Sequence, residues 1–296
     1  MDGQGGARPV IGIIGGSGLY DMDALTHKEW RKVTTPFGDP SDELLCGDIG
    51  GTSVVFLPRH GRGHRYAPSD LNYRANIFAL KTMGVTEILS LSACGSLQEH
   101  LAPGTFVIVD QFIDRTFARV KSFFEAGLVA HVSMAQPVCG RLGDALESAA
   151  RSLGIPYAPG GTYLAMEGPQ FSTLAESNLY RSWNCDVIGM TNMPEAKLAR
   201  EAEMCYATVA MVTDYDCWHE GHGAVTVDQV VRVLLANADK ARNLVKHVTP
   251  ALGGHSGPCE RGCHHALDSA LITAPAARSS ELVKKLSPIV GRVLAR

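Results

Sequence analysis

Two aspartates stand directly after a long apolar run near the start of the last third of the chain. Residues 206–213 read Tyr-Ala-Thr-Val-Ala-Met-Val-Thr, which predicts a strand buried on both faces in a parallel sheet, and Asp214 and Asp216 follow it. Positions i and i+2 of an extended chain point to the same side, so we expect both carboxylates to enter one crevice. Two close carboxylates raise the pKa of one of them, which favours acid catalysis near neutral pH. An acidic turn that merely ends a strand is an equally open interpretation at this point.

Polar side chains that can bind an anion follow several other predicted strands. They are Ser17 after a strand at 9–14, Arg59 and His60 after 54–57, Ser92 at the end of 88–92, and Thr191 after residues 186–189. Glycine-rich backbone around Ser17 can form an anion nest, and arginine offers phosphate a fixed fork of donors. This loop is not a dinucleotide fingerprint, because Asp21 stands where the third glycine belongs, and it has no P-loop lysine. A simple tight turn and an ordinary loop cap remain alternatives for these positions.

Helices alternate with strands over most of the chain, which predicts one layered α/β domain. We predict helices at residues 68–83, 140–153, 173–183, 195–203, 226–248 and 279–294, and further strands at 105–110 and 160–166. The apolar positions at the start of the helix 226–248 are expected to face the core. We expect residues 1–252 to form this domain. The composition then shifts to Gly, Ser, Pro and Ala, so we expect residues 253–296 to be an arm and a helix packed on this domain or on a neighbouring subunit.

Composition narrows the class of protein. The 296 residues carry a net charge of -3, which gives no electrostatic reason to expect nucleic acid or an anionic membrane as a partner. No apolar run is long enough to span a bilayer, and the first residues lack the apolar region of a signal peptide. The eight cysteines stand mostly in core-like contexts, as reduced thiols do. We therefore expect a soluble, cytoplasmic protein.

The arm carries the one cysteine and histidine grouping that suggests a metal. Cys259, Cys263, His264 and His265 form a C-x3-C-H-H pattern. This spacing puts neighbouring ligands awkwardly close, and the sequence shows no second pair of ligands elsewhere. The sequence therefore favours no metal site and no cofactor.

The anion donors, the acid pair and an aromatic ring together fit one reaction. Gly168-Pro169 forces a turn and presents Phe171 as a platform for a flat ligand. The matching reaction is attack of phosphate on the anomeric carbon of a nucleoside while an acid protonates the leaving purine. Such cleavage passes through an oxocarbenium-like state, so it needs leaving-group protonation and an anion beneath the sugar.

Eight motifs, in order and at matching spacing, closely resemble the purine nucleoside phosphorylase family, and within it the members that act on 5'-methylthioadenosine. The motifs are Gly12-Ile-Ile-Gly-Gly-Ser-Gly-Leu, Thr35-Pro-Phe-Gly-x-Pro-Ser-Asp, Arg59-His60-Gly61, Ala93-Cys-Gly-Ser-Leu, Asp110-Gln-Phe-Ile-Asp-Arg, Glu167-Gly-Pro-x-Phe-Ser, Met190-Thr191 and Thr213-Asp-Tyr-Asp-Cys-Trp. The resemblance covers about residues 10 to 252. It implies a single-domain nucleoside phosphorylase fold, with a mixed central sheet flanked by helices, commonly assembled as a homotrimer with sites at subunit interfaces.

The resemblance also implies a role for each site residue. Phosphate, the co-substrate, would be bound by Ser17, Arg59, His60, Ser92, Thr191 and the backbone amide of Ala93. In the nucleoside site, Asp214 would protonate N7 of the purine and Asp216 would accept a hydrogen bond from the N6 amine. Met190 would lie against the ribose, and Phe171 would lie beside the base and the sugar. Val227 and Val230 would surround the 5' substituent, and His131 would come from a neighbouring subunit. The expected products are adenine and 5-methylthioribose 1-phosphate, which belong to purine and methionine salvage.

Two alternatives differ from this expectation. One is a 6-oxopurine nucleoside or methylthioinosine phosphorylase, in which the carbonyl O6 needs a donor and asparagine would suit the position of Asp214 better. The other is a noncatalytic nucleoside-binding protein with the same fold, which loss of the phosphate cluster or of the acid would favour. Neither is lost in this sequence.

Overall fold

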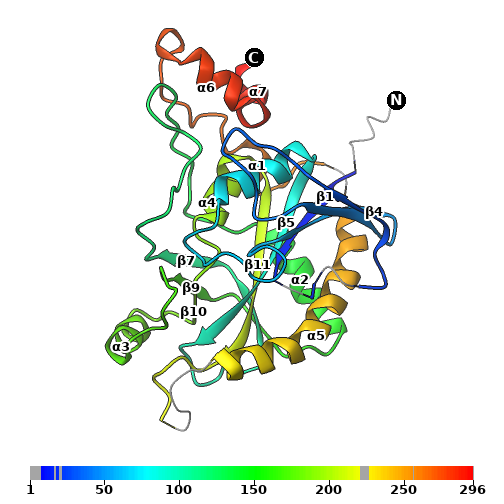
Figure 1. Cartoon of the computed structure of the whole chain (residues 1–296), viewed down its shortest axis with the longest axis vertical. Helices are drawn as coiled ribbons and strands as arrows, with labels where there is room; N and C mark the ends of the chain where they lie inside the picture. The colour runs from blue at the N-terminus through cyan, green and yellow to red at the C-terminus, as the bar shows by residue number, and fades with distance from the viewer. Residues whose placement is uncertain (1–7, 17, 20–21, 221–226, 256, 296) are drawn as a thin grey trace.

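A mixed β-sheet forms the centre of the molecule, with helices on both faces (Figure 1). The computed structural model describes residues 8–295 except 17, 20–21, 221–226 and 256. The strands are β1 Val10–Gly15, β2 Thr26–Arg31, β3 Leu44–Ile49, β4 Thr52–Pro58, β5 Val85–Ser96, β6 Phe106–Val109, β7 Gln111–Asp114, β8 Tyr157–Pro159, β9 Thr162–Ala165, β10 Val187–Gly189 and β11 Cys205–Asp214. The α-helices are α1 Tyr73–Thr82, α2 Gly140–Ser152, α3 Leu174–Ser182, α4 Glu195–Glu201, α5 Val227–Gly253, α6 Ser280–Lys285 and α7 Ser287–Leu294. This confirms the predicted mixed sheet flanked by helices.

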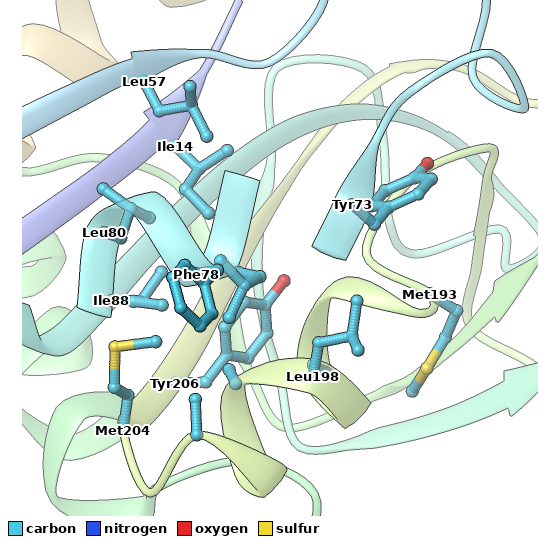
Figure 2. Close-up of a cluster of buried hydrophobic side chains, with 14 of the residues drawn as sticks. Ile14, Leu57, Tyr73, Phe78, Leu80, Ile88, Met193, Leu198, Met204 and Tyr206 are labelled. Atoms are coloured by element: carbon cyan, nitrogen blue, oxygen red, sulfur yellow. The ribbon is translucent and has the colours of Figure 1, made fainter. Parts of the chain in front are cut away.

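The central place of strand β11 in the sheet explains why its sequence is apolar at consecutive positions. Its side chains alternate between two hydrophobic clusters, because successive residues of a strand point to opposite faces. Tyr206 and Val212 pack with α1, α4 and α7, whereas Val209 and Met211 pack with α2 and α5. Figure 2 shows Tyr206 in the first cluster with Phe78 of α1. The predicted burial on both faces is therefore confirmed.

The sheet order brings the predicted donors to neighbouring strand ends. Strands β4, β1, β5 and β10 are consecutive in the sheet, and β11 pairs with β5. Strands β1, β4 and β11 run parallel to their neighbours in this group, whereas β10 runs antiparallel to β5. Asp214 lies opposite Gly95 of β5.

Several predicted boundaries are wrong for local reasons. Helix α1 begins at Tyr73 and not at residue 68, because Asn72 caps it by accepting from the backbone N–H of Ala75. The strand predicted at 88–92 is longer and runs from Val85 to Ser96, because residues 93–96 also pair with β10 and β11. The predicted terminal helix is two helices that meet at Leu286, with a proline in the first turn of the second. Strands β2, β3, β7 and β8 were not predicted.

The C-terminal segment completes the core. Leu286, Ile289 and Val290 are buried in the same cluster as α1. Arg292 donates from Nε to Glu203 over 2.7 Å, which ties α7 to the residues just before β11. From these contacts we infer that α7 and the described residues leading to it belong to the same domain. Among the described residues, none of the helices combines the length and the apolar character that crossing a bilayer requires.

Candidate active site

The acid pair meets in a turn at the carboxyl end of β11. The strand ends at Asp214, and Asp216 has a φ of 51°. The backbone N–H of Asp216 donates to Asp214 Oδ1 over 2.8 Å. The expectation that an extended chain aligns the two carboxylates is therefore wrong. They lie close together because the chain turns back at Asp216, into a left-handed conformation that aspartate tolerates better than most residues.

Asp214 lies in a setting that favours the protonated acid. Burial raises the pKa of its carboxyl, although the hydroxyl of Thr213 and the N–H of Asp216 stabilise the charged form. Thr213 Oγ1 lies 2.7 Å from Asp214 Oδ2 and 3.1 Å from the carbonyl oxygen of Cys94. A Cβ at Gly95 would lie 2.9 Å from Asp214 Oδ1, so only glycine leaves room for the acid here. Desolvation, and not charge repulsion, is the main reason that this carboxyl can hold a proton.

Asp216 is more deeply buried and carries an unsatisfied acceptor. It is 5% exposed, and its Oδ2 has no hydrogen-bond partner among the described residues. Burial raises the pKa of Asp216 and the charge of Asp214 raises it further, while the nearby hydroxyl of Ser177 lowers it. A buried carboxylate oxygen without a donor costs free energy. The site is therefore complementary to a ligand that brings a hydrogen-bond donor to this oxygen.

The segment before α3 lies against this turn. The thiol of Cys217 donates to the carbonyl oxygen of Ser172 over 3.4 Å, which places the neighbouring Phe171 beside the acid pair in the chain fold. The ring of Phe171 is 43% exposed. Met190 packs against Gly168, where an added Cβ would lie 2.5 Å from its sulfur. The aromatic platform and Met190 thus come from segments that border the acid pair.

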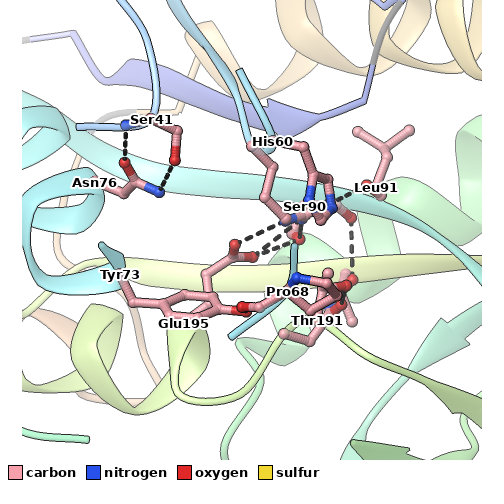
Figure 3. Close-up of polar contacts among 12 residues, drawn as sticks. Ser41, His60, Pro68, Tyr73, Asn76, Ser90, Leu91, Thr191 and Glu195 are labelled. Carbon is pink, nitrogen blue, oxygen red and sulfur yellow. Dashed lines mark hydrogen bonds and ion pairs between the residues drawn. The ribbon is translucent and has the colours of Figure 1, made fainter. Parts of the chain in front are cut away.

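Arg59 sits in a buried polar network beneath the donors. It is 2% exposed and donates from Nε to Glu195 Oε2 over 3.0 Å, from Nη2 to Ser90 Oγ and Glu195 Oε1, and from Nη1 to the carbonyl oxygen of Leu91. Figure 3 shows Ser90, Leu91 and Glu195 converging, with His60 and Thr191 nearby. Burial alone would lower the pKa of Arg59, but the Glu195 carboxylate outweighs it and raises the pKa. The contacts use four of its five N–H donors, one from Nε, one from Nη1 and two from Nη2.

Glu195 is the residue of this site that sequence reasoning missed. It accepts from Ser90 Oγ over 2.7 Å and from the hydroxyl of Tyr206 over 2.8 Å, besides Arg59. Burial would raise the pKa of its carboxyl, but the charge of Arg59 lowers it below the ordinary value. The sequence marked Glu195 only as the start of a helix. No local signal joins it to Arg59, which lies 136 residues away in the chain.

His60 presents an acceptor nitrogen in its neutral form. Its Nδ1 lies 2.9 Å from the carbonyl oxygen of Tyr66, which can only accept, so Nδ1 carries the hydrogen and Nε2 is left as the acceptor. The ring stacks on that of His64, with centroids 4.3 Å apart. Burial and then the charge of Arg59 lower the pKa of His60 to about 4.

The remaining phosphate-site predictions fall at neighbouring strand positions. Ser92 is buried in β5, and its hydroxyl has no hydrogen-bond partner among the described residues. The backbone of Ala93 follows it in the same strand. Thr191, just beyond β10, donates to Asn192 Oδ1 over 2.9 Å. Both Ser92 and Thr191 lie close enough to Tyr163 to lower the pKa of its hydroxyl, so they share one corner of the site. Ser17 lies outside the described residues.

Three predicted residues lie away from the acid pair or open to solvent. Val227 is 65% exposed and Val230 half-buried in the first turn of α5. Val231 and Leu235 of α5 are also exposed, so the prediction that the start of this helix faces the core is wrong. His131 is exposed on the loop after β7, which rises towards α6 and α7 at the opposite end of the molecule from the carboxyl end of β11 (Figure 1).

With the site in view, comparison with known proteins decides the family. The family model described as "Phosphorylase superfamily" matches residues 10–250. The chain belongs to this superfamily. It is 64% identical over 287 residues to the S-methyl-5'-thioadenosine phosphorylase of Rhodospirillum rubrum, covering 97% of this chain and 98% of the relative. The enzyme of the same name from Cereibacter sphaeroides is 61% identical, over 97% of this chain and 99% of its own length.

Solved phosphorylase structures have the same fold. A methylthioadenosine phosphorylase from an antarctic soil metagenomic library is similar at a TM-score of 0.89 and 50% identity, covering 95% of this chain and 99% of its own. A mutant adenosine/methylthioadenosine phosphorylase from Schistosoma mansoni, in complex with methylthioadenosine, has a TM-score of 0.80 and 38% identity, covering 84% of this chain and 93% of its own. The resemblance found in the sequence is therefore confirmed.

The spacing between the two halves of this phosphorylase site is set by β5. Ser92 lies on the donor side, and Gly95, opposite Asp214, lies three residues further along the strand. Three residues of a strand span about 10 Å. The site therefore has room for a ligand of about this length between the anion donors and the carboxyl of Asp214.

The lowered pKa of His60 predicts how the stability of the protein depends on pH. The folded protein holds the ring neutral down to about pH 4, whereas the unfolded chain takes up a proton near its ordinary pKa of 6.5. The free energy of unfolding should therefore fall as the pH drops from about 6.5 to about 4. His60→Asn keeps a donor for the Tyr66 carbonyl but cannot titrate, so its unfolding free energy should fall less over the same range. Denaturant unfolding at several pH values measures both slopes. Equal slopes, or an NMR titration of folded His60 near 6.5, would contradict the burial of a neutral ring.

Proposed function

We propose that this chain catalyses phosphorolysis of 5'-methylthioadenosine to adenine and 5-methylthioribose 1-phosphate, as a pentosyltransferase of purine and methionine salvage. The observation that carries the proposal is the acid pair of half-buried Asp214 and buried Asp216 in a chain of the phosphorylase superfamily. The names of its relatives at up to 64% identity support the substrate. Inorganic phosphate is a co-substrate, and the proposed reaction uses no cofactor.

At the base, the two carboxyls have different roles. Asp214 gives its proton to N7, which turns the purine into a neutral leaving group, and its raised pKa supports this role. Asp216 accepts from the N6 amine through its unpartnered Oδ2. An amino group satisfies that oxygen, whereas the carbonyl of a 6-oxopurine would meet it with a second acceptor. This argument favours adenine over hypoxanthine.

At the phosphate, the donors act mainly as a set of hydrogen bonds. Because Arg59 is already paired with Glu195, its positive charge is largely compensated. Its main contribution to phosphate binding is a hydrogen bond from the remaining Nη1 hydrogen, which the pair holds in a fixed position. The hydroxyl of Ser92, the hydroxyl of Thr191 and the N–H of Ala93 complete the set, together with Ser17. The neutral ring of His60 accepts from a phosphate hydroxyl through Nε2.

The rest of the substrate would be held by the residues that border the acid pair. The amide of Met190 binds a ribose hydroxyl and Phe171 lies beside base and sugar. The exposed Val227 and half-buried Val230 give an apolar wall for the methylthio group.

His131 would complete the site of a neighbouring subunit in a homotrimer. Its exposed position, and the exposure of Phe117 (82%) and Val120 (58%) in the same long segment after β7, support an interface formed by this segment. A cytoplasmic location is also part of the proposal, supported by the eight cysteines, none of which forms a disulfide in the described residues.

The proposed function predicts that adenine release requires phosphate. Purified enzyme given methylthioadenosine should release adenine and an equal amount of sugar 1-phosphate, with no release when phosphate is removed. Inosine and methylthioinosine, assayed in parallel, should be poor substrates. Full-rate release without phosphate would contradict phosphorolysis, and a preference for 6-oxopurines would contradict the assignment of the base.

The acid role of Asp214 predicts a specific kinetic loss. Asp214→Asn keeps the shape of the side chain but cannot transfer a proton, so kcat on methylthioadenosine should fall by about 10²–10⁴-fold. Because an amide can donate to O6, activity on inosine should fall less or rise. Asp216→Asn is the matched variant, with a smaller loss of kcat expected. Circular dichroism checks that both variants fold, and wild-type turnover by folded Asp214→Asn would remove Asp214 from the role of acid.

Two neighbouring serines of β5 give a matched test of the phosphate site. Ser92→Ala removes a buried hydroxyl without a partner, so stability should change by less than about 0.5 kcal/mol, while KM for phosphate rises about tenfold or more. Ser90→Ala removes a hydroxyl that links Arg59 to Glu195, so the protein should lose about 1–3 kcal/mol of stability. An unchanged phosphate KM in Ser92→Ala would show that this hydroxyl does not bind phosphate.

A further inference from the structure

Four cysteines converge at the amino end of β11, away from the acid pair. They are Cys139, Cys205, Cys259 and Cys263, all buried, with their sulfur atoms within 4.8 Å of one another. The sulfur of Cys259 lies 3.4 Å from that of Cys139 and 3.6 Å from that of Cys263. Within the described residues this is the only group of three or more metal-ligating side chains so placed.

Two distant segments supply the ligands that the sequence pattern of the arm lacks. Cys139 precedes α2, and its N–H donates to the carbonyl oxygen of Tyr206 over 2.8 Å, which holds it beside the start of β11. Cys205 is the first residue of β11. Cys259 and Cys263 lie on a turn that closes when the N–H of Gly262 donates to the carbonyl oxygen of Cys259 over 2.8 Å. The fold therefore brings two core cysteines to the C-x3-C pair of the arm.

The arrangement has the dimensions of a tetrahedral tetrathiolate. A Zn–S bond of about 2.3 Å puts the corners of a regular tetrahedron about 3.8 Å apart. The sulfur separations in the cluster are of this size. Four sulfur ligands in this geometry select zinc among the common divalent ions, and they leave no open position for a substrate. We propose that Cys139, Cys205, Cys259 and Cys263 bind one structural Zn²⁺ ion.

Groups around the cluster suit the negative charge that four thiolates and one Zn²⁺ carry together. Arg141 Nη2 lies 3.9 Å from the sulfur of Cys205. His264 accepts at Nδ1 from the N–H of Cys259, so its Nε2 carries the hydrogen and points it at the sulfur of Cys205, 3.5 Å away. His264 is thus a donor to a ligand and not a ligand itself, which is the usual role of such outer groups.

The ion fastens the arm to the core and takes no part in the proposed reaction. Cys205 and Asp214 are the two ends of a ten-residue strand, so the cluster lies about 30 Å from the acid. Beyond Cys263 the arm runs to residues that pair with the His131 loop, where the N–H of His131 donates to the carbonyl oxygen of Ala270 over 2.9 Å. The zinc therefore fixes the start of a segment that supports the proposed subunit contact.

The test is the metal content of the full-length protein, purified from zinc-supplied cells without chelators. Mass spectrometry of the metals should find about one zinc per chain. Cys263→Ser and Cys139→Ser should lose most of it, whereas Cys46→Ser, a matched change of a thiol outside the cluster, should keep it. The two cluster variants should also melt at a lower temperature than Cys46→Ser.

A measurement on the unchanged protein covers the case in which the cluster variants do not fold. A thiol-modifying mercurial should release the zinc in step with reaction of four thiols, as read with a zinc-binding dye. Exchange of the zinc for Co²⁺ should give the intense visible bands of a tetrahedral tetrathiolate. A zinc-free protein with eight free thiols, a disulfide between any two of the four cysteines in an unreduced digest, or equal zinc in Cys263→Ser and wild type would each overturn the proposal.

Discussion

The buried ion pair of Arg59 and Glu195 is the interaction on which the rest of the site depends. It joins the end of β4 to the start of α4, and through Ser90 and Tyr206 it reaches β5 and β11. A buried charge is tolerated only when it is paired and fully hydrogen-bonded, and loss of one partner typically costs about 3–5 kcal/mol. The pair therefore fixes the relative positions of four elements, of which β4 leads directly to the donor Arg59, β5 carries the donor Ser92 and β11 carries the acid Asp214.

Strand β11 positions the other part of the site, the acid Asp214. Nine of its ten residues are buried, and its side chains are packed by helices on both faces of the sheet. A one-residue shift in register would send each set of side chains into the opposite cluster, where its sizes and shapes do not match the packing. The position of Asp214 is thus determined by both hydrophobic clusters at once, and Gly95 on the neighbouring strand leaves the space that its carboxyl occupies.

The sequence predicted the parts of the site that have a local signature. The apolar run before Asp214 and the donors at strand ends are such signals, because burial on both faces and strand termini leave patterns in neighbouring residues. Glu195 has no such signature, since its partner is far away in the chain. The left-handed turn at Asp216 was missed because the alternation of an extended strand was continued two residues beyond its end at Asp214. Apolar residues spaced one helical turn apart, such as Val227 and Val231, give the same sequence pattern whether the helix face is buried in a core or exposed at the surface. The exposure of these side chains could therefore not be predicted.

The contribution of the last two helices to the core has a consequence for synthesis on the ribosome. Leu286, Ile289 and Val290 cover the same apolar cluster as Phe78 of α1, which is translated about 200 residues earlier. Until residue 290 leaves the exit tunnel, the nascent chain carries an uncovered apolar face on a helix that has already formed. Translation that stalls or stops before this point would leave a polypeptide with most of its sheet in place and a surface that chaperones and proteases recognise.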